Sequence, residues 1–271
     1  MTTYSGNEVF DMVAERGWRR GFGNLMNGEL SSWFKSRRWL KHFLVWMIIV
    51  NGMMAIMAYA TAESAEAGAE GPPLLLMYGI FGGMTVAIGV MIVMQRVIVG
   101  EKREGTAAWV LSKPVTRTAF VVSRLVVNSF AILLTSVVIP GILVYVTFGA
   151  LTPLGWLSPL GFLGGIAMFV LHTFYFITLT LMMGAFSESA TAVIAVPMTV
   201  YFAFWFGPNM IPALLHVSPL LLTFAPETIL SLSASFMLGE PVYSWGPLIS
   251  TIVGCVVFIA VAIWRFNRQE F

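Results

Sequence analysis

The chain has 271 residues, of which 58% are hydrophobic and only 10% are charged, and its formal net charge is +2. Soluble domains carry about 25% charged residues, and a helix that spans a bilayer needs about 20 apolar residues. The composition therefore excludes an ordinary soluble globular protein and predicts an all-α protein with several membrane spans. A transmembrane β-barrel is excluded as well, because the apolar runs are continuous rather than alternating.

Residues 1–41 are predicted to form a cytoplasmic region with an amphipathic helix. Leu25, Met26, Leu30, Trp33, Phe34 and Arg37 recur at helical spacing, whereas Asn27, Glu29, Ser31, Ser32 and Lys35 fall on the other side. This pattern is typical of a helix that lies in the headgroup layer with its apolar face toward the lipid. A solvated tail without a partner is the alternative.

Residues 42–271 are predicted to form a transmembrane domain of six spans. We place the spans at residues 42–61, 74–99, 120–148, 159–186, 190–206 and 245–264. Two of them carry clusters of small residues that permit close contact between helices. These are Gly79, Gly82 and Gly83 in the second span and Gly161, Gly164 and Gly165 in the fourth.

The basic residues predict the orientation, because loops rich in Lys and Arg stay on the cytoplasmic side. Seven Lys or Arg residues precede the first span, six lie at or near the loop between spans 2 and 3, and none lies between residues 125 and 264. Both termini are therefore expected inside the cell, in agreement with an even number of spans. The loop at residues 187–189 has no basic residue, so charge does not place it.

The outer segment before the last span, residues 207–243, is unusually apolar for a loop. Leucines recur along it and four prolines interrupt it. Irregular backbone at membrane depth is tolerated only where protein buries it or where it lines a cavity. We therefore expect short re-entrant helices on the extracellular side rather than a free loop.

Motifs for catalysis are missing from the sequence. Residues 100–106 read G-x-x-x-x-G-T, but a phosphate-binding loop needs Lys directly after the second Gly, and Thr106 stands in its place. His172 is the one histidine deep inside a predicted span, and a hydrogen-bonded packing role is expected for it. No pair of carboxylates lies within a span, which argues against an intramembrane enzyme.

The loop at residues 100–117 carries an internal pattern that most short loops of membrane proteins lack. Glu101-x-x-Glu104-Gly105-Thr106, followed by Leu111-Ser112-x-Pro114-Val115-x-Arg117, resembles the loop between spans 2 and 3 of type-2 ABC (ATP-binding cassette) export permeases. The whole predicted layout is similar to that of this family. Lys102 and Arg103, between the two glutamates, depart from the family's usual pattern.

The resemblance implies that this chain is the membrane subunit of an exporter and no enzyme itself. The loop would be the coupling helix that docks on a separate ATPase subunit through Glu101, Glu104, Gly105, Thr106, Trp109, Val110, Pro114 and Arg117. The chain itself would bind no cofactor, metal or nucleic acid, since ATP and Mg²⁺ would sit on the ATPase.

The expected further partners are membrane lipid and a second permease, either another copy of this chain or a paralogue. The expected location is the plasma membrane, as a multi-pass protein of a bacterial or archaeal inner membrane. A non-transporting membrane scaffold or sensor subunit is the alternative function, because the sequence carries no substrate signature.

Overall fold

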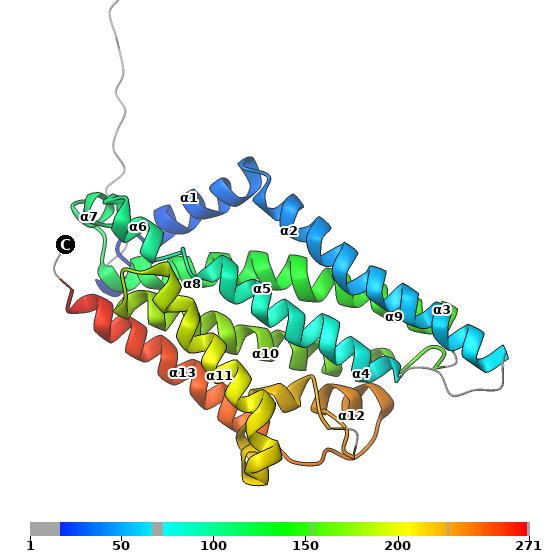
Figure 1. Cartoon of the computed structure of the whole chain (residues 1–271). Coiled ribbons are helices and arrows are strands. Elements are labelled where there is room, and N and C mark those ends of the chain that lie inside the picture. Colours follow the sequence, from blue (N-terminus) through cyan, green and yellow to red (C-terminus); the bar gives the residue numbers. More distant parts are fainter. Residues whose placement is uncertain (1–16, 67–72, 153, 227, 270–271) are drawn as a thin grey trace, which may run out of the picture.

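The computed structural model describes residues 17–66, 73–152, 154–226 and 228–269. Within these ranges every regular element is helical, and six helices are long and apolar enough to cross a membrane. The predicted all-α class with six spans is therefore confirmed. The spans run side by side along the bundle in Figure 1. The orientation of the termini stays a prediction, because charge alone supports it.

The first three spans are each built from consecutive helical segments, with a short π-helical stretch inside each. Span 1 consists of α2 (Arg38–Trp46), η2 (Met47–Gly52) and α3 (Met53–Glu66). Span 2 consists of α4 (Leu74–Tyr78), η3 (Gly79–Met84), α5 (Thr85–Met94) and α6 (Val99–Arg103). Span 3 consists of α8 (Arg117–Leu133), η4 (Leu134–Val138) and α9 (Ile139–Leu151).

The last three spans are single helices, α10 (Pro159–Phe186), α11 (Ala190–Met210) and α13 (Gly246–Asn267). Before span 1 lie η1 (Gly17–Arg19) and α1 (Phe22–Lys35), and α7 (Thr106–Leu111) lies between spans 2 and 3. Between spans 5 and 6 lie η5 (Pro212–Val217), η6 (Pro219–Leu222) and α12 (Leu232–Leu238).

The helices run a few residues beyond several of the predicted span ends, and two of these extensions have identifiable reasons. Span 2 continues to Arg103 rather than ending at residue 99, because the backbone hydrogen bonds Gly100 N to Arg96 O and Lys102 N to Ile98 O extend the helix. Span 5 passes through Pro208 to Met210. Proline removes one donor, but Ile211 N still donates to Gly207 O at 2.7 Å and closes the last turn.

The centre of the bundle is α10. In its most apolar window of 18 residues 67% are buried, against 17% for α11. Figure 1 shows α10 lying among α5, α8, α11 and α13. The outer spans keep apolar side chains on their surfaces, as expected for helices that face lipid.

The segment between spans 5 and 6 folds back against α10 at the end of the bundle opposite α7 (Figure 1). Leu220, Leu221 and Leu222 are buried. A Cβ added at Gly79 would overlap the Thr223 carbonyl, and one at Gly161 would overlap the Phe236 carbonyl. Five of the six glycines expected to bring spans together therefore admit this segment instead, whereas Gly82 lies against Tyr78 and Phe169. Its re-entry into the bilayer stays a prediction, and its first residues, 211–213, are exposed.

His172 fastens the same segment to the central helix. Its side chain is fully buried, and Nδ1 lies 2.9 Å from the carbonyl oxygen of Pro219, at the start of η6. A backbone carbonyl oxygen inside an apolar bundle, such as that of Pro219, needs a hydrogen-bond donor. The expected packing role of His172 is confirmed.

Candidate functional site

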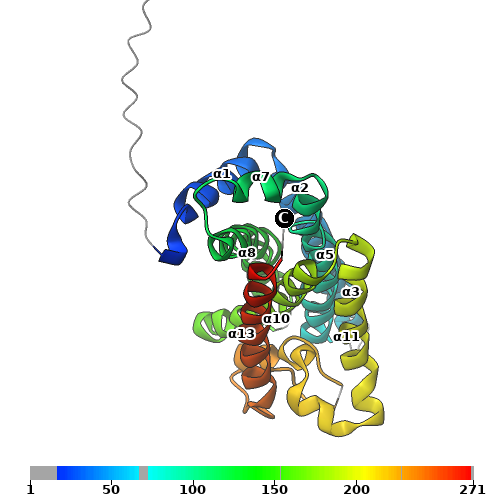
Figure 2. The ribbon, with the colours of Figure 1, turned by 90° about the vertical axis from the view of Figure 1, so that its left-hand side faces the viewer.

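The chain between α5 and α8 forms two short helices rather than one. α6 completes span 2, and α7 starts anew after Gly105, whose φ of +72° lies in the left-handed region. Glycine reaches that region without the cost that a Cβ imposes, so Gly105 makes the break. Figure 2 views the bundle from this end, where α7 lies close to α1, α8 and the C-terminal part of the chain.

Glu101 points into the protein from α6. Its carboxylate is ion-paired with the guanidinium of Arg124, on α8. The hydroxyl of Thr106 donates to the backbone oxygen of Glu101 at 3.1 Å. Two residues of the predicted coupling set, Glu101 and Thr106, thus connect α6 and α7 to each other and to span 3.

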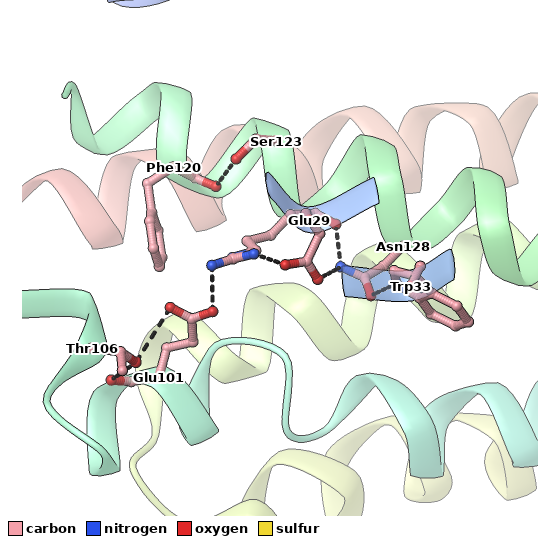
Figure 3. A network of polar contacts seen from close by, with 8 residues as sticks. Glu29, Trp33, Glu101, Thr106, Phe120, Ser123 and Asn128 are labelled. Carbon is pink, nitrogen blue, oxygen red and sulfur yellow. Dashed lines mark hydrogen bonds and ion pairs between the residues drawn. The ribbon is translucent and has the colours of Figure 1, made fainter. Parts of the chain in front are cut away.

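Arg124 is also ion-paired with Glu29, on α1. Asn128, one turn further along α8, donates to Glu29 Oε1 at 3.3 Å and accepts from Trp33 Nε1 at 3.0 Å. Figure 3 shows this network, which joins α1, α6 and α8 through the side chain of Arg124. Arg124 itself is only 9% exposed, and its Cζ lies 5.4 Å from the centre of the Phe120 ring.

The prediction that Trp33 shares a face with Phe34 and lies opposite Glu29 was wrong. Glu29 faces the bundle with Trp33, which is 3% exposed, whereas Phe34 is 58% exposed. Residues four apart share one side of a helix, so burial of Trp33 brings Glu29 inward. The carboxylate is tolerated there because Arg124 and Asn128 pair with it.

Lys102 fixes α6 to the central helix. Its Nζ donates to the carbonyl oxygens of Gly184 at 2.9 Å and Ala185 at 3.1 Å, in the last turn of α10. Gln269, beyond the end of α13, donates to the same Ala185 oxygen at 2.6 Å. These contacts place the loop at residues 187–189 at the same end of the bundle as α7. The charge pattern alone did not assign this loop to either end.

The remaining loop residues divide into inward and outward groups. Val110 packs against the core, whereas Trp109 is 66% exposed and Glu104 is exposed at the end of α6. Lys113 Nζ lies 5.3 Å from the centre of the Trp109 ring. Of the two neighbouring apolar residues in the predicted docking set, Trp109 is therefore presented at the surface and Val110 is not.

The last two members of the predicted set lie where the loop returns to the bundle. α7 ends at Leu111, before Pro114, and Arg117 begins α8. Arg117 Nη1 donates to the backbone oxygen of Asn267 at 2.7 Å, in the last residue of α13. The loop is therefore attached to the ends of spans 2, 3, 4 and 6.

This architecture defines a multi-pass helical membrane protein whose most highly connected polar site lies at one end of the bundle. Among the described residues, no group of three or more His, Cys, Asp or Glu side chains is arranged to hold a metal. The family described as ABC-2 family transporter protein matches residues 26–271, and the chain belongs to that family. The comparison with curated proteins found no significant match.

Proposed function

We propose that this chain is the permease subunit of an ATP-driven exporter. Family membership supports a transporter membrane domain, and export follows from the resemblance of residues 100–117 to the loop of export permeases. Two such subunits, identical or paralogous, would enclose the path. Separate ATPase subunits would hydrolyse ATP with Mg²⁺.

The observation that most directly supports an ATPase partner is the exposure of the Trp109 side chain. A tryptophan that is 66% exposed on a six-residue helix leaves a large apolar surface in water. Tryptophan is among the residues most enriched at the energetic centres of protein interfaces. Its exposed neighbours Glu104 and Lys113 supply charge of both signs, so the surface fits a folded protein partner better than lipid tails.

The contacts behind Trp109 give a route by which docking would move the spans. Glu101 links α6 to α8 and, through Arg124, to α1. Lys102 links α6 to the end of α10. A displacement of α7 by a closing ATPase would therefore reach several spans through short polar contacts rather than through a flexible loop. Energetic coupling between distant sites can run through such contiguous contacts between rigid elements. It can also arise when both sites bias the same equilibrium between two conformations.

Purification of the tagged chain from its host tests the proposal. An ATPase subunit of the ABC type should copurify, and its ATP hydrolysis in proteoliposomes should depend on this chain. A scaffold or sensor subunit would instead bind its partners without any effect on ATP hydrolysis. The proposal fails if the copurified complex contains no ATPase, or if hydrolysis is the same with and without the chain.

A further inference from the structure

A concentrated group of exposed cations and rings lies where α1 turns into α2. We call residues 34–41 the elbow. Its cations are Lys35, Arg37, Arg38 and Lys41, and its rings are those of Phe34 and Trp39. All six side chains are exposed, and the two ring centroids lie 6.3 Å apart. Figure 1 shows the turn between α1 and α2 standing away from the other spans.

No acidic side chain of the chain's own neutralises these cations in the described structure. No Asp or Glu occurs between Glu29 and Glu63, and Glu29 is engaged by Arg124. Among the described residues, neither of the two ion-paired carboxylates contacts an elbow cation. The elbow therefore offers four positive charges to an external anion.

The depth of the elbow is fixed by the start of span 1. The candidate span begins at Arg38, so the elbow lies at the boundary between water and hydrocarbon, whichever side of the membrane this boundary faces. Aromatic rings and cations with long apolar stems are the side chains that favour this layer. The elbow thus lies at the level of the lipid headgroups.

The backbone of the elbow supplies an independent observation. Arg37 has a φ of +55°, and it is the one non-glycine residue with a positive φ in the described part of the chain. A Cβ disfavours this conformation, and glycine or asparagine is the usual choice there. Retaining an arginine in a strained turn is consistent with a function for its side chain.

We infer that the elbow binds the headgroups of anionic phospholipids, with its four cations around the phosphate and its two rings at the glycerol level. Clusters of Lys and Arg at the end of a span attract anionic lipid, whereas zwitterionic lipid offers no net charge. This inference does not depend on the proposed exporter function, because it rests on the elbow alone.

The test measures lipid retention by the purified full-length protein in detergent, titrated with phosphatidylglycerol or with phosphatidylcholine of the same acyl chains. The elbow variant is K35Q/R37Q/R38Q/K41Q. The matched control, R19Q/R20Q/R103Q/R268Q, removes four exposed cations from the same end of the bundle. The elbow variant should lose affinity for phosphatidylglycerol by about tenfold or more, and the control by less than about threefold. Binding of phosphatidylcholine should not change.

Three outcomes would overturn the assignment. Equal losses in the two variants would mean that overall charge, not the elbow, attracts the lipid. If the elbow variant binds phosphatidylglycerol with unchanged affinity, the elbow is not a lipid-binding site. Displacement of the lipid by the same concentration of soluble glycerol phosphate would mean a site for free phosphate instead.

The variant Arg37→Gly separates binding from folding. Glycine relieves the left-handed turn, so the thermal midpoint should not fall. Affinity for phosphatidylglycerol should nevertheless drop, because one of the four cations is gone. If Arg37→Gly retains full affinity for phosphatidylglycerol, the Arg37 side chain has no role in lipid binding. Lipid binding would then not explain why an arginine occupies this strained turn.

Discussion

Arg124, on span 3, forms an ion pair with Glu29, which lies 95 positions earlier in the chain, on α1. The two side chains are only 11% and 15% exposed. The second carboxylate on the same guanidinium, that of Glu101, comes from the end of span 2. One cation therefore holds together the three elements on which the proposed coupling loop rests.

Arg124→Gln should destabilise the protein by about 2 kcal/mol or more, because it leaves two largely buried carboxylates close together without a cation. The expected result is a lower thermal midpoint in detergent and weaker coupling of ATP hydrolysis to the permease. Thermal unfolding of the purified variant measures the first effect directly.

The triple variant E29Q/E101Q/R124Q is the control for this prediction. It removes all three charges but keeps side chains that can form hydrogen bonds, so most of the lost stability should return. If the single and triple variants are equally unstable, packing around Arg124 rather than charge pairing holds the network.

Lys102→Gln should weaken the attachment of α6 to α10, because the shorter amide side chain cannot reach both carbonyl oxygens at the end of α10. ATPase binding should be retained, while stimulation of hydrolysis falls. Arg103→Gln is the matched control, since Arg103 is exposed beside it. Equal behaviour of the two variants would show that Lys102 contributes no more than a surface charge.

The topology can be checked with single cysteines in a Cys255→Ala background, since Cys255 is buried and is the chain's one cysteine. The sites are Lys113→Cys, Ser187→Cys and Glu240→Cys. On intact cells an impermeant thiol reagent should label position 240 alone, and positions 113 and 187 should react only after permeabilisation. Labelling of position 113 on intact cells would reverse the orientation. Residues 67–72, in the loop between spans 1 and 2 that this orientation places outside the cell, are not among the described residues.

Most of the fold could be predicted from the sequence because hydrophobicity decides where a chain crosses a membrane. The six apolar runs and the stretch without Lys or Arg after Arg124 required no knowledge of packing. The span ends at Arg103 and Met210 could not be predicted, because local hydrogen bonds extend those helices beyond the apolar runs. The segment that packs against the glycines could not be predicted either, because a small residue indicates only that some neighbouring part of the chain approaches closely.

The site was only partly predictable because its key contacts join distant parts of the chain. The loop residues could be named from their pattern, but Glu29, Trp33 and Asn128 were not singled out as site residues. A signal did exist, since a charged residue such as Arg124 inside the start of a span needs a partner. Several acidic residues were candidates, and only the packing of α1 on α8 decides among them.

Glu104→Lys should abolish ATPase binding without disturbing the fold. Glu104 is exposed between the C-terminal end of α6 and the N-terminal end of α7, so the two helix dipoles act on its charge in opposite directions. Any loss would therefore arise at the partner's surface, where reversal of charge costs affinity. Co-precipitation of the ATPase, at equal permease levels, measures the effect. Normal binding by this variant would remove Glu104 from the docking surface.

The most direct test of the proposed function is the affinity of the purified ATPase for Trp109→Ala. The exposed ring contributes little to the fold, so loss of an interface anchor should appear as a binding defect of about 2 kcal/mol or more, with a normal thermal midpoint. Trp18→Ala is the matched control, because Trp18 is 50% exposed on η1, outside the loop. Affinity for the ATPase should fall for Trp109→Ala alone. Wild-type affinity and wild-type coupled hydrolysis in Trp109→Ala would contradict this prediction.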